Sequence, residues 1–202
     1  MNSIVDIMRQ EIIDRSNNFF RETQGTKDEY NIYEEHVKYV YEYVMLLAKD
    51  KNVDLEVLQL SSLLHDIAMT DINLDRVKHN EYGAEIAGQL LNKYDYPKEK
   101  AEFVKKCILN HSSARIKYRT TEEEKILVDA DGLSHFDAIY GLYSLAHNVM
   151  ELDDSDALNF IKDKLTKDYN EISDNLKYLI KDKYDKVMAC MYISDLLKIF
   201  GK

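Results

Sequence analysis

The chain contains very few residues that interrupt helices. Its 202 residues include one proline and six glycines, whereas a β-sandwich or β-barrel needs turn residues about every 8–12 positions. All-β folds are therefore nearly excluded, and the predicted fold class is all-α. A chain of this length buries enough surface to fold without a metal or a disulfide. We therefore expect residues 1–202 to form a single domain.

Apolar side chains recur at helical spacing in the first part of the sequence. Tyr33, Val37, Val40, Val44 and Leu47 step by three or four residues, which predicts one face of a helix. The same pattern predicts further helices, at about residues 54–67, 79–94, 97–108 and 121–133.

Residues suited to helix starts precede several of these segments. Asp54 and Thr121 are predicted N-caps, and Pro97 is tolerated at a first helical position because its missing N–H is not needed there. Residues 68–78 and 112–120 lose the apolar pattern and are predicted to be loops.

The composition changes after Met150. Residues 151–156 (ELDDSD) predict a turn, and the rest of the chain is rich in Lys, Asp and Tyr. Two amphipathic helices are predicted there, one carrying Ile172, Leu176 and Leu179 and the other carrying Val187, Met188 and Met191. We expect residues 150–202 to pack on the same core. Their tyrosines either cap that core or form a homodimer interface.

The charge balance limits the class of partner. With 27 basic and 37 acidic residues, the formal net charge is −10, so neither duplex nucleic acid nor an anionic membrane is an expected partner. The longest apolar run, Val187–Ile193, is too short to cross a membrane, and residues 1–14 lack the apolar core of a signal peptide. A cytoplasmic protein is expected. Cys107 and Cys190 are far apart, and no disulfide framework is predicted.

Histidine and aspartate side chains occur in a fixed order at or near the ends of the apolar helical segments. They are His36, His65, Asp66, His79, His111 and Asp131. Imidazole and carboxylate donors together suit a divalent ion such as Mn, Fe, Co, Ni or Zn. Such an ion can lower the pKa of a bound water and polarise a phosphoryl oxygen.

The alternative interpretation is that these are ordinary core residues. A single histidine on an apolar face is more often a hydrogen-bonded core residue than a ligand, and a His–Asp dipeptide arises easily by chance. However, Asp66 lies at the end of a helix that is expected to be buried, shortly after Leu63 and Leu64, and Asp131 lies among Ile126, Leu127 and Leu133. A charged carboxylate in such surroundings is costly without a partner. A shared cation provides that partner, which favours a metal site.

The series H…HD…H…H…D and its flanking residues resemble the HD superfamily of metal-dependent phosphohydrolases. The matching stretches cover about residues 30–145 and are His36–Val40, Leu60–Ala68, His79–Leu91, Val104–Ala114 and Glu123–Ile139. Within the superfamily, the chain is most similar to the small stand-alone bacterial proteins. The resemblance implies an HD-type helical bundle, to which residues 150–202 add C-terminal helices.

The resemblance also implies the ligand set. It assigns His36, His65, Asp66 and Asp131 to a metal ion, and gives His79 and His111 either a second metal or the substrate phosphate. The ion can also be Mg, and one or two ions are possible. Asp129 lies two residues before Asp131 and therefore points elsewhere on its helix, where a cap or a hydrogen-bond acceptor is the expected role. His135 and His147 are not expected to bind metal. His135 and Asp137 either line the mouth of the pocket or close a helix.

Two positions depart from the family pattern. Tyr39 stands where an arginine commonly follows the first histidine, beside Lys38, and the segment after His65–Asp66 is AMTD in place of a glycine–lysine pair. Phosphate recognition must then come from other basic residues, for which the candidates are Lys78, Arg115, Lys117 and Arg119.

The function implied is hydrolysis of a phosphate ester or anhydride in a small nucleotide-like substrate. The expected catalytic residues are His65, Asp66, His79 and His111, with Asp66 taking a proton from water and His79 or His111 donating to the phosphoryl group. One alternative is a di-iron oxygenase similar to myo-inositol oxygenase, because that group shares the same series of histidines and aspartates. The other is a non-catalytic metal-binding regulatory module.

Overall fold

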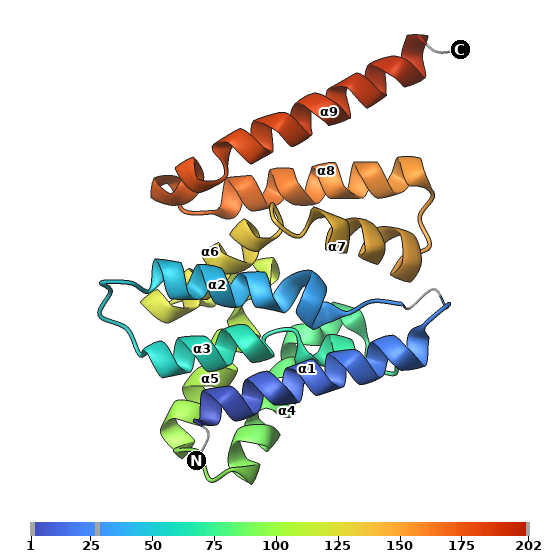
Figure 1. Cartoon of the computed structure of the whole chain (residues 1–202). Helices are drawn as coiled ribbons and strands as arrows, with labels where there is room; N and C mark the ends of the chain where they lie inside the picture. Colours follow the sequence, from blue (N-terminus) through green and yellow to red (C-terminus); the bar gives the residue numbers. More distant parts are fainter. Residues whose placement is uncertain (1–2, 27–28, 201–202) are drawn as a thin grey trace.

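The computed structural model describes residues 3–26 and 29–200, with side chains up to residue 192. The described residues form helices joined by short turns and contain no β-strand, so the predicted all-α class is confirmed (Figure 1). The α-helices are α1 (Ile4–Thr23), α2 (Lys38–Leu47), α3 (Leu55–Leu64), α4 (His79–Lys93), α5 (Lys98–Asn110), α6 (Glu122–Ser134), α7 (Ile139–Ser144), α8 (Asp154–Glu171) and α9 (Lys181–Phe200).

Helix α3 lies at the centre of the bundle. It packs against α1, α2, α5 and α6, and its side chains are buried on almost every side, including Leu58, Leu60, Leu63 and Leu64. A helix that is apolar all round must be enclosed by other helices. The residues that follow its last turn therefore begin in the interior, which places His65 inside the bundle.

The predicted N-caps of α3 and α6 are confirmed. The Asp54 side chain accepts a hydrogen bond from the backbone N–H of Val57, and Thr121 forms a capping box with Glu124. Pro97 occupies the N-cap of α5, with ψ at 122°, one residue before the predicted position. The proline still lies outside the hydrogen-bonded turns, where its missing N–H costs nothing.

The predicted helix from Tyr33 begins differently from expectation. A π-helical turn spans Tyr33–Val37, and α2 follows it. The segments predicted as loops contain short 3₁₀ helices, at Ile67–Thr70, Arg76–Lys78 and Ser113–Tyr118. The side chain of the first histidine in the series thus comes from the π turn, a local irregularity that the regular apolar spacing does not reveal.

The C-terminal part contains one long helix that was not predicted, and one predicted helix is wrong. Helix α8 spans Asp154–Glu171, whereas Leu176 and Leu179 lie in a short 3₁₀ helix, Asp174–Leu179, and not in an amphipathic α-helix. Helix α8 packs on α6 and α7, and α9 lies against α8 and extends away from the bundle (Figure 1). The predicted helix around Val187 corresponds to α9.

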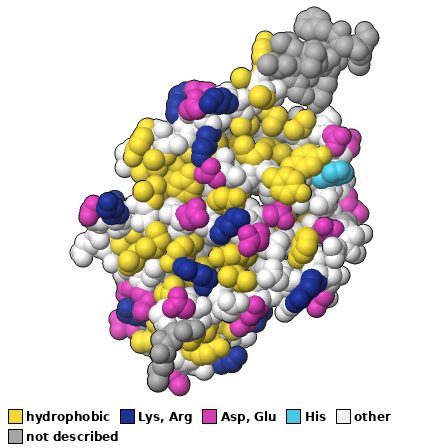
Figure 2. Space-filling model, in the orientation of Figure 1, with side chains coloured by type: hydrophobic (Ala, Val, Ile, Leu, Met, Phe, Trp, Pro, Cys, Tyr) yellow, Lys and Arg dark blue, Asp and Glu magenta, His cyan; other side chains and the backbone are white. Residues whose placement is uncertain are grey.

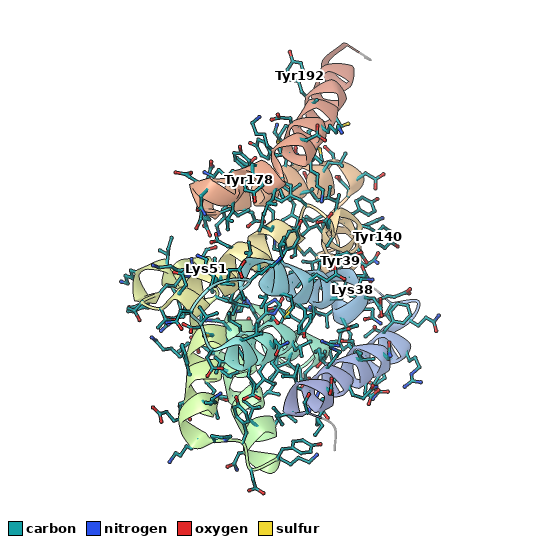
Figure 3. The ribbon with its side chains drawn as sticks, turned by 60° about the vertical axis from the view of Figure 1, so that its left-hand side comes forward. Lys38, Tyr39, Lys51, Tyr140, Tyr178 and Tyr192 are labelled. Carbon is teal, nitrogen blue, oxygen red and sulfur yellow. The ribbon has the colours of Figure 1, made fainter. Side chains whose placement is uncertain are left out.

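The outer surface mixes charge and apolar groups. On the face in Figure 2, lysine, arginine and acidic side chains are interspersed with hydrophobic ones, and no continuous basic patch is visible there. Tyr178 and Tyr192 point outward on the C-terminal extension (Figure 3) and are 75% and 63% exposed. These two tyrosines therefore do not cap the core. The homodimer stays a prediction. Within the described part of the chain, no helix combines the length and apolarity that a membrane crossing requires.

One buried carboxylate fixes the start of α6. Glu124 Oε2 accepts hydrogen bonds from the backbone N–H groups of Thr120 and Thr121, both at 2.9 Å, and Oε1 accepts one from the Asn110 side chain at 2.6 Å. Lys106 Nζ lies 3.2 Å from Oε2. Burial alone would raise the pKa of Glu124, but these donors outweigh it and lower the pKa to about 2.

We expect Glu124→Gln to lower the free energy of unfolding at pH 7 by about 1–3 kcal/mol, because the folded pKa lies about two units below the unfolded one. The carboxylate stabilises the fold above the unfolded pKa, so the difference should shrink as the pH falls from about 4.5 towards 2. Urea unfolding followed by circular dichroism at pH 7 and pH 3 measures both effects.

The matched control is Glu122→Gln in the same helical turn. Its side chain is 44% exposed and pairs with Lys51 at 2.8 Å, and an exposed pair contributes less than about 1 kcal/mol. If both variants lowered the free energy of unfolding by the same amount, the role given to the buried Glu124 carboxylate would be contradicted.

Candidate metal centre

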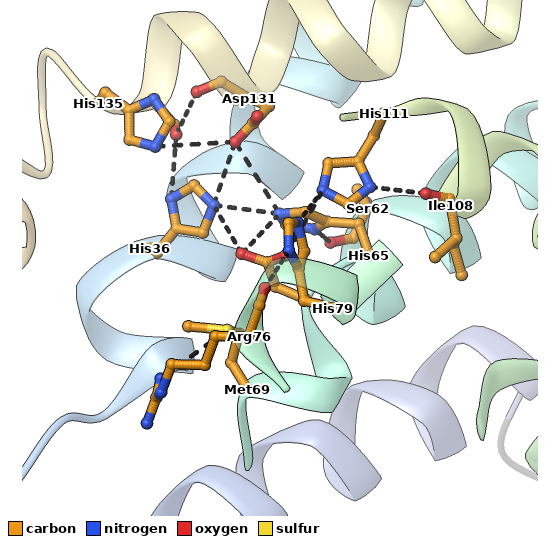
Figure 4. Close-up of polar contacts among 12 residues, drawn as sticks. His36, Ser62, His65, Met69, Arg76, His79, Ile108, His111, Asp131 and His135 are labelled. Atoms are coloured by element: carbon orange, nitrogen blue, oxygen red, sulfur yellow. Dashed lines mark hydrogen bonds and ion pairs between the residues drawn. The ribbon is translucent and has the colours of Figure 1, made fainter. Parts of the chain in front are cut away.

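The four predicted metal ligands meet His79 and His111, the two residues predicted to bind a second metal or the phosphate, beside the end of α3 (Figure 4). Asp66 directly follows His65 at the end of α3, His79 begins α4, and Asp131 lies in the last turns of α6. His36 comes from the π turn, and His65 and His111 are the C-caps of α3 and α5. Helix ends, and not flexible loops, therefore carry most of the site.

Three of these residues form the first cluster: His36, His65 and Asp131. His36 Nε2 lies 3.0 Å from His65 Nε2 and 3.2 Å from Asp131 Oδ1. His65 Nε2 lies 3.9 Å from the same oxygen. Both histidines are buried, so bulk water has little access to their rings.

The second cluster consists of Asp66, His79 and His111. His79 Nε2 and His111 Nε2 are 3.1 Å apart, and they lie 3.7 and 3.5 Å from Asp66 Oδ1. The other oxygen of Asp66, Oδ2, lies 3.7 Å from the Nε2 atoms of both His36 and His65. One carboxylate thus presents one oxygen to each cluster, as a bridging ligand in a two-metal site would.

The far nitrogen of each histidine ring fixes which way the ring is protonated. In three histidines Nδ1 lies within 2.8 Å of a backbone carbonyl three residues earlier (Figure 4). The pairs are His65 with Ser62, His79 with Arg76, and His111 with Ile108. A carbonyl can only accept, so Nδ1 carries the hydrogen, and the neutral ring keeps its lone pair on Nε2.

His36 reaches the same state through a serine. Its Nδ1 lies 3.3 Å from Ser134 Oγ, and the Ser134 hydroxyl donates to the carbonyl of Asp131 at 2.7 Å. Because that hydroxyl hydrogen is already used, Ser134 accepts from His36 Nδ1–H. The Nε2 lone pair of His36 is therefore also directed at the cluster, in the arrangement by which outer hydrogen bonds orient metal-binding histidines.

These lone pairs face one another at hydrogen-bond distance without a hydrogen between them. Burial lowers the pKa of His65 to about 4, so the His65 ring is neutral at pH 7 and its Nε2 keeps the lone pair. Asp66 Oδ1 is buried and has no hydrogen-bond partner among the described residues. Nitrogen lone pairs and carboxylate oxygens around one space are the donor set of a divalent cation, and the residues present fit such an ion.

Both carboxylates are held in their charged form. Burial opposes ionisation of Asp66, but the neighbouring His65, His111 and His79 keep its pKa well below the usual range. Asp131 behaves in the same way, because His135 and His36 outweigh its burial. The two aspartates thus supply negative charge where a cation would bind.

Comparison with known protein families agrees with this site. A model of the HD domain matches residues 33–135, about half of the chain, and this range contains both clusters. The chain belongs to the HD-domain family. Among curated proteins, none matches the sequence.

Solved HD-domain structures and related proteins share the fold. Bacillus subtilis YpgQ, in a complex with ADP, is 19% identical, with a TM-score of 0.65 and coverage of 97% of each chain. A predicted HD superfamily hydrolase from an uncultured Thermotogales bacterium is 26% identical, with a TM-score of 0.52 and coverage of 78% of this chain and 84% of that one. A Listeria innocua protein is 18% identical, with a TM-score of 0.62 and coverage of 99% of each chain.

A cavity of about 400 Å³ opens onto both clusters of the HD domain. Its basic lining residues are Arg76, Lys164 and Lys167. The phosphate candidates from the sequence, Lys78, Arg115, Lys117 and Arg119, are not among the residues that line it.

The arginines predicted to bind phosphate are engaged elsewhere. Arg119 donates to the backbone carbonyls of His111 and Ser112, both at 2.9 Å, and so secures the turn after α5. Arg115 donates to the side chain of Asn110 at 2.9 Å. Lys164 and Lys167 lie on α8, outside the matched range, and only tertiary packing brings them to the cavity.

Three other predicted positions can be placed. Asp129 points away from the clusters and accepts two hydrogen bonds from Ser173, at 2.8 and 2.7 Å, which agrees with the predicted role of cap or acceptor. Asp137 accepts from Tyr43 and Lys183 at the surface. Lys38, on the outside of α2, pairs with Glu34, and its ammonium lies over the Tyr39 ring (Figure 3).

His147 packs edge-on against Tyr143 and belongs to neither cluster. His135 is different, because it lines the cavity and stacks on His36 with 5.0 Å between ring centres. His135 is the C-cap of α6 and follows Asp131 by four residues. This spacing in the sequence could have predicted that the two side chains lie on one face.

We expect Asp66→Asn to weaken the binding of two metal ions, each by at least about 10-fold, because its carboxylate faces both clusters. Asp131→Asn should weaken only one. Calorimetric titration of the metal-free protein with Mn²⁺ or Co²⁺ gives the stoichiometry and affinities. Asp129→Asn, a carboxylate of α6 outside both clusters, is the control and should bind like the wild type. Loss of a single ion in Asp66→Asn would contradict the bridging position.

Metal affinity should also fall as the pH is lowered from about 7.5 to 5.5. Burial lowers the pKa of His111, but Asp66 outweighs it and raises the pKa above the ordinary value. A proton therefore competes with the ion for the second cluster at a higher pH than for a free histidine. The same titration at several pH values measures this, and an affinity independent of pH would contradict it. In His111→Gln the pH dependence should be shallower.

Proposed function

We propose that this protein is a divalent-metal-dependent phosphohydrolase that acts on a small nucleotide-like substrate. The observation that carries the proposal is the position of Asp66, whose two oxygens face two histidine clusters on the floor of one cavity. Hydrolysis of a phosphate ester or anhydride needs an activated water and a means of stabilising negative charge on the phosphoryl oxygens. Paired cation sites beside a cavity meet both needs.

The residues that would hold the ions follow from the two clusters. His36, His65 and Asp131 would bind one ion, His79 and His111 the other, and Asp66 would contribute to both. An ion there would supply Lewis-acid chemistry, which makes hydroxide available near neutral pH and draws charge from a phosphoryl oxygen. The mixture of imidazole and carboxylate suits Mn, Fe, Co, Ni or Zn, with Mg also a candidate.

The chain's own groups would position and deprotonate the water. We propose that Asp66, whose oxygens lie near both clusters, takes the proton of the attacking water. His79, with a side chain 26% exposed, is the more accessible histidine of the second cluster. If only one ion binds, His79 and His111 are free to hydrogen-bond the phosphoryl group, and the number of bound ions decides between these roles.

The shape of the cavity supports a nucleotide-like substrate. Leu142, Leu145 and Phe160 form an apolar part of the lining that suits a base, whereas Lys167, whose side chain is 56% exposed, suits phosphate oxygens. A volume of about 400 Å³ lies within the range of small-molecule pockets. YpgQ, which shares the fold, was solved in complex with ADP, which supports the same substrate class here.

The test is hydrolysis of a panel of nucleoside mono-, di- and triphosphates by metal-free protein resupplied with Mn²⁺, Co²⁺, Ni²⁺ or Mg²⁺. We expect activity only with metal, and a loss of at least about 100-fold in kcat for Asp66→Asn. Asp129→Asn should keep nearly full activity. Hydrolysis that survives both chelation and Asp66→Asn would contradict the proposal.

A di-iron oxygenase is the second candidate, because a carboxylate shared by two histidine clusters suits two irons as well. Metal analysis of protein purified without added metal separates the two functions. Two irons per chain together with dioxygen uptake would replace hydrolysis as the main activity. Protein that binds metal but hydrolyses none of the panel would instead favour a regulatory module.

A further inference from the structure

One face of α8 lines the metal-site cavity, although α8 lies beyond the matched HD range of residues 33–135. The residues on this face recur at helical spacing over nearly three turns. They are Phe160, Lys164, Lys167, Asp168 and Glu171. The C-terminal extension therefore contributes side chains to the same cavity as the histidine clusters.

The most buried polar residue on this face is Asp168, which is 5% exposed. Lys164 Nζ lies 2.7 and 2.9 Å from its two oxygens, and His135 Nδ1 lies 3.0 Å from Oδ2. Lys164 Nζ is also 3.3 Å from His135 Nδ1. Since Lys164 donates to both carboxylate oxygens and the aspartate contact is the shorter one, the Nδ1 hydrogen of His135 is assigned to Asp168.

That assignment leaves the Nε2 lone pair of His135 directed at the first cluster. His135 Nε2 lies 3.9 Å from Asp131 Oδ1 (Figure 4), the same distance as His65 Nε2. The His135 ring also lies nearly parallel to His36, with 9° between the ring planes. His135 thus shares both features of the four cluster histidines, an Nδ1–H held by a protein acceptor and an Nε2 atom facing the site.

We propose that His135, oriented by Asp168, is an additional donor to the ion held at His36 and Asp131, so that α8 takes part in metal binding. This reverses the expectation that His135 does not bind metal. The proposal rests on the metal centre described above, but it holds whichever reaction that centre performs. A purely structural role, in which the Asp168 cluster only anchors α8 to α6, predicts no change in metal binding when the cluster is altered.

The experiment is titration of the metal-free protein with Co²⁺, followed by calorimetry and visible absorption. His135→Phe keeps a ring against His36 but lacks nitrogen, and we expect about 10–100-fold weaker binding of one ion and a changed Co²⁺ spectrum. Asp168→Asn keeps the shape but loses the charge that orients His135, and about 10-fold weaker binding is expected. Thermal unfolding of each variant shows that the fold is intact.

Asp163→Asn is the matched control on the same helix. Asp163 is an exposed carboxylate that is not among the residues lining the cavity, so this variant should bind Co²⁺ like the wild type. Wild-type affinity and spectrum in both His135→Phe and Asp168→Asn would overturn the proposal and leave the hydrolase proposal standing. A wild-type protein that binds no divalent ion would instead remove the metal centre itself.

A measurement on the wild type avoids any dependence on variants that fold poorly. With ¹⁵N-labelled imidazoles, addition of Zn²⁺ should move the Nε2 resonance of His135 together with those of His36 and His65. A His135 resonance that stays in place while the others move would overturn the proposal.

Discussion

The candidate metal centre depends on histidine lone pairs that face each other across a few ångströms. Hydrogen bonds to the outer nitrogen leave Nε2 of His36, His65, His79 and His111 as acceptors directed inward. Neutral acceptors at 3.0 and 3.1 Å repel one another unless a positive charge lies between them. The carbonyls that orient His65 and His111 are those of Ser62 and Ile108, in the last turns of α3 and α5. One hydrogen bond at each helix end therefore does two things. It gives a terminal carbonyl a donor, and it orients the histidine ring so that Nε2 points towards the clusters.

This arrangement also makes an acidic chain compatible with the anionic substrate that we propose. A formal charge of −10 repels extended polyanions, and the face in Figure 2 mixes both signs of charge. The electrostatic potential inside the cavity does not follow the net charge of the chain, because divalent ions, when bound, are the largest local charges in such a site. On the α8 side, Lys164 and Lys167 are balanced by Asp168 and Glu171, with which they pair. The net charge of the chain therefore disfavours large polyanions as partners, but it does not disfavour a small anion that binds inside the cavity.

Much of the fold and the cluster membership could be predicted from local patterns. The scarcity of proline and glycine gave the all-α class, and capping residues located the starts of α3 and α6. Helix α1 was not predicted, because its apolar positions are mixed with acidic side chains, and Leu176 and Leu179 were misassigned because a 3₁₀ helix has a similar spacing. The basic residues of the cavity were missed for a different reason. Exposure and charge alone do not separate Arg119, which holds backbone carbonyls, from Lys164, which reaches the cavity.

The sequence by itself determined which donors are available and in what order they follow the helices, because residue type and periodicity are local properties. It also placed Asp129 and Asp131 on different faces of α6, since two residues on a helix point apart. Only the tertiary structure decided that Asp66 lies between two clusters, that His135 stacks on His36, and that α8 closes the cavity with Asp168. These contacts join residues up to about a hundred positions apart, and packing of the whole bundle sets their distances.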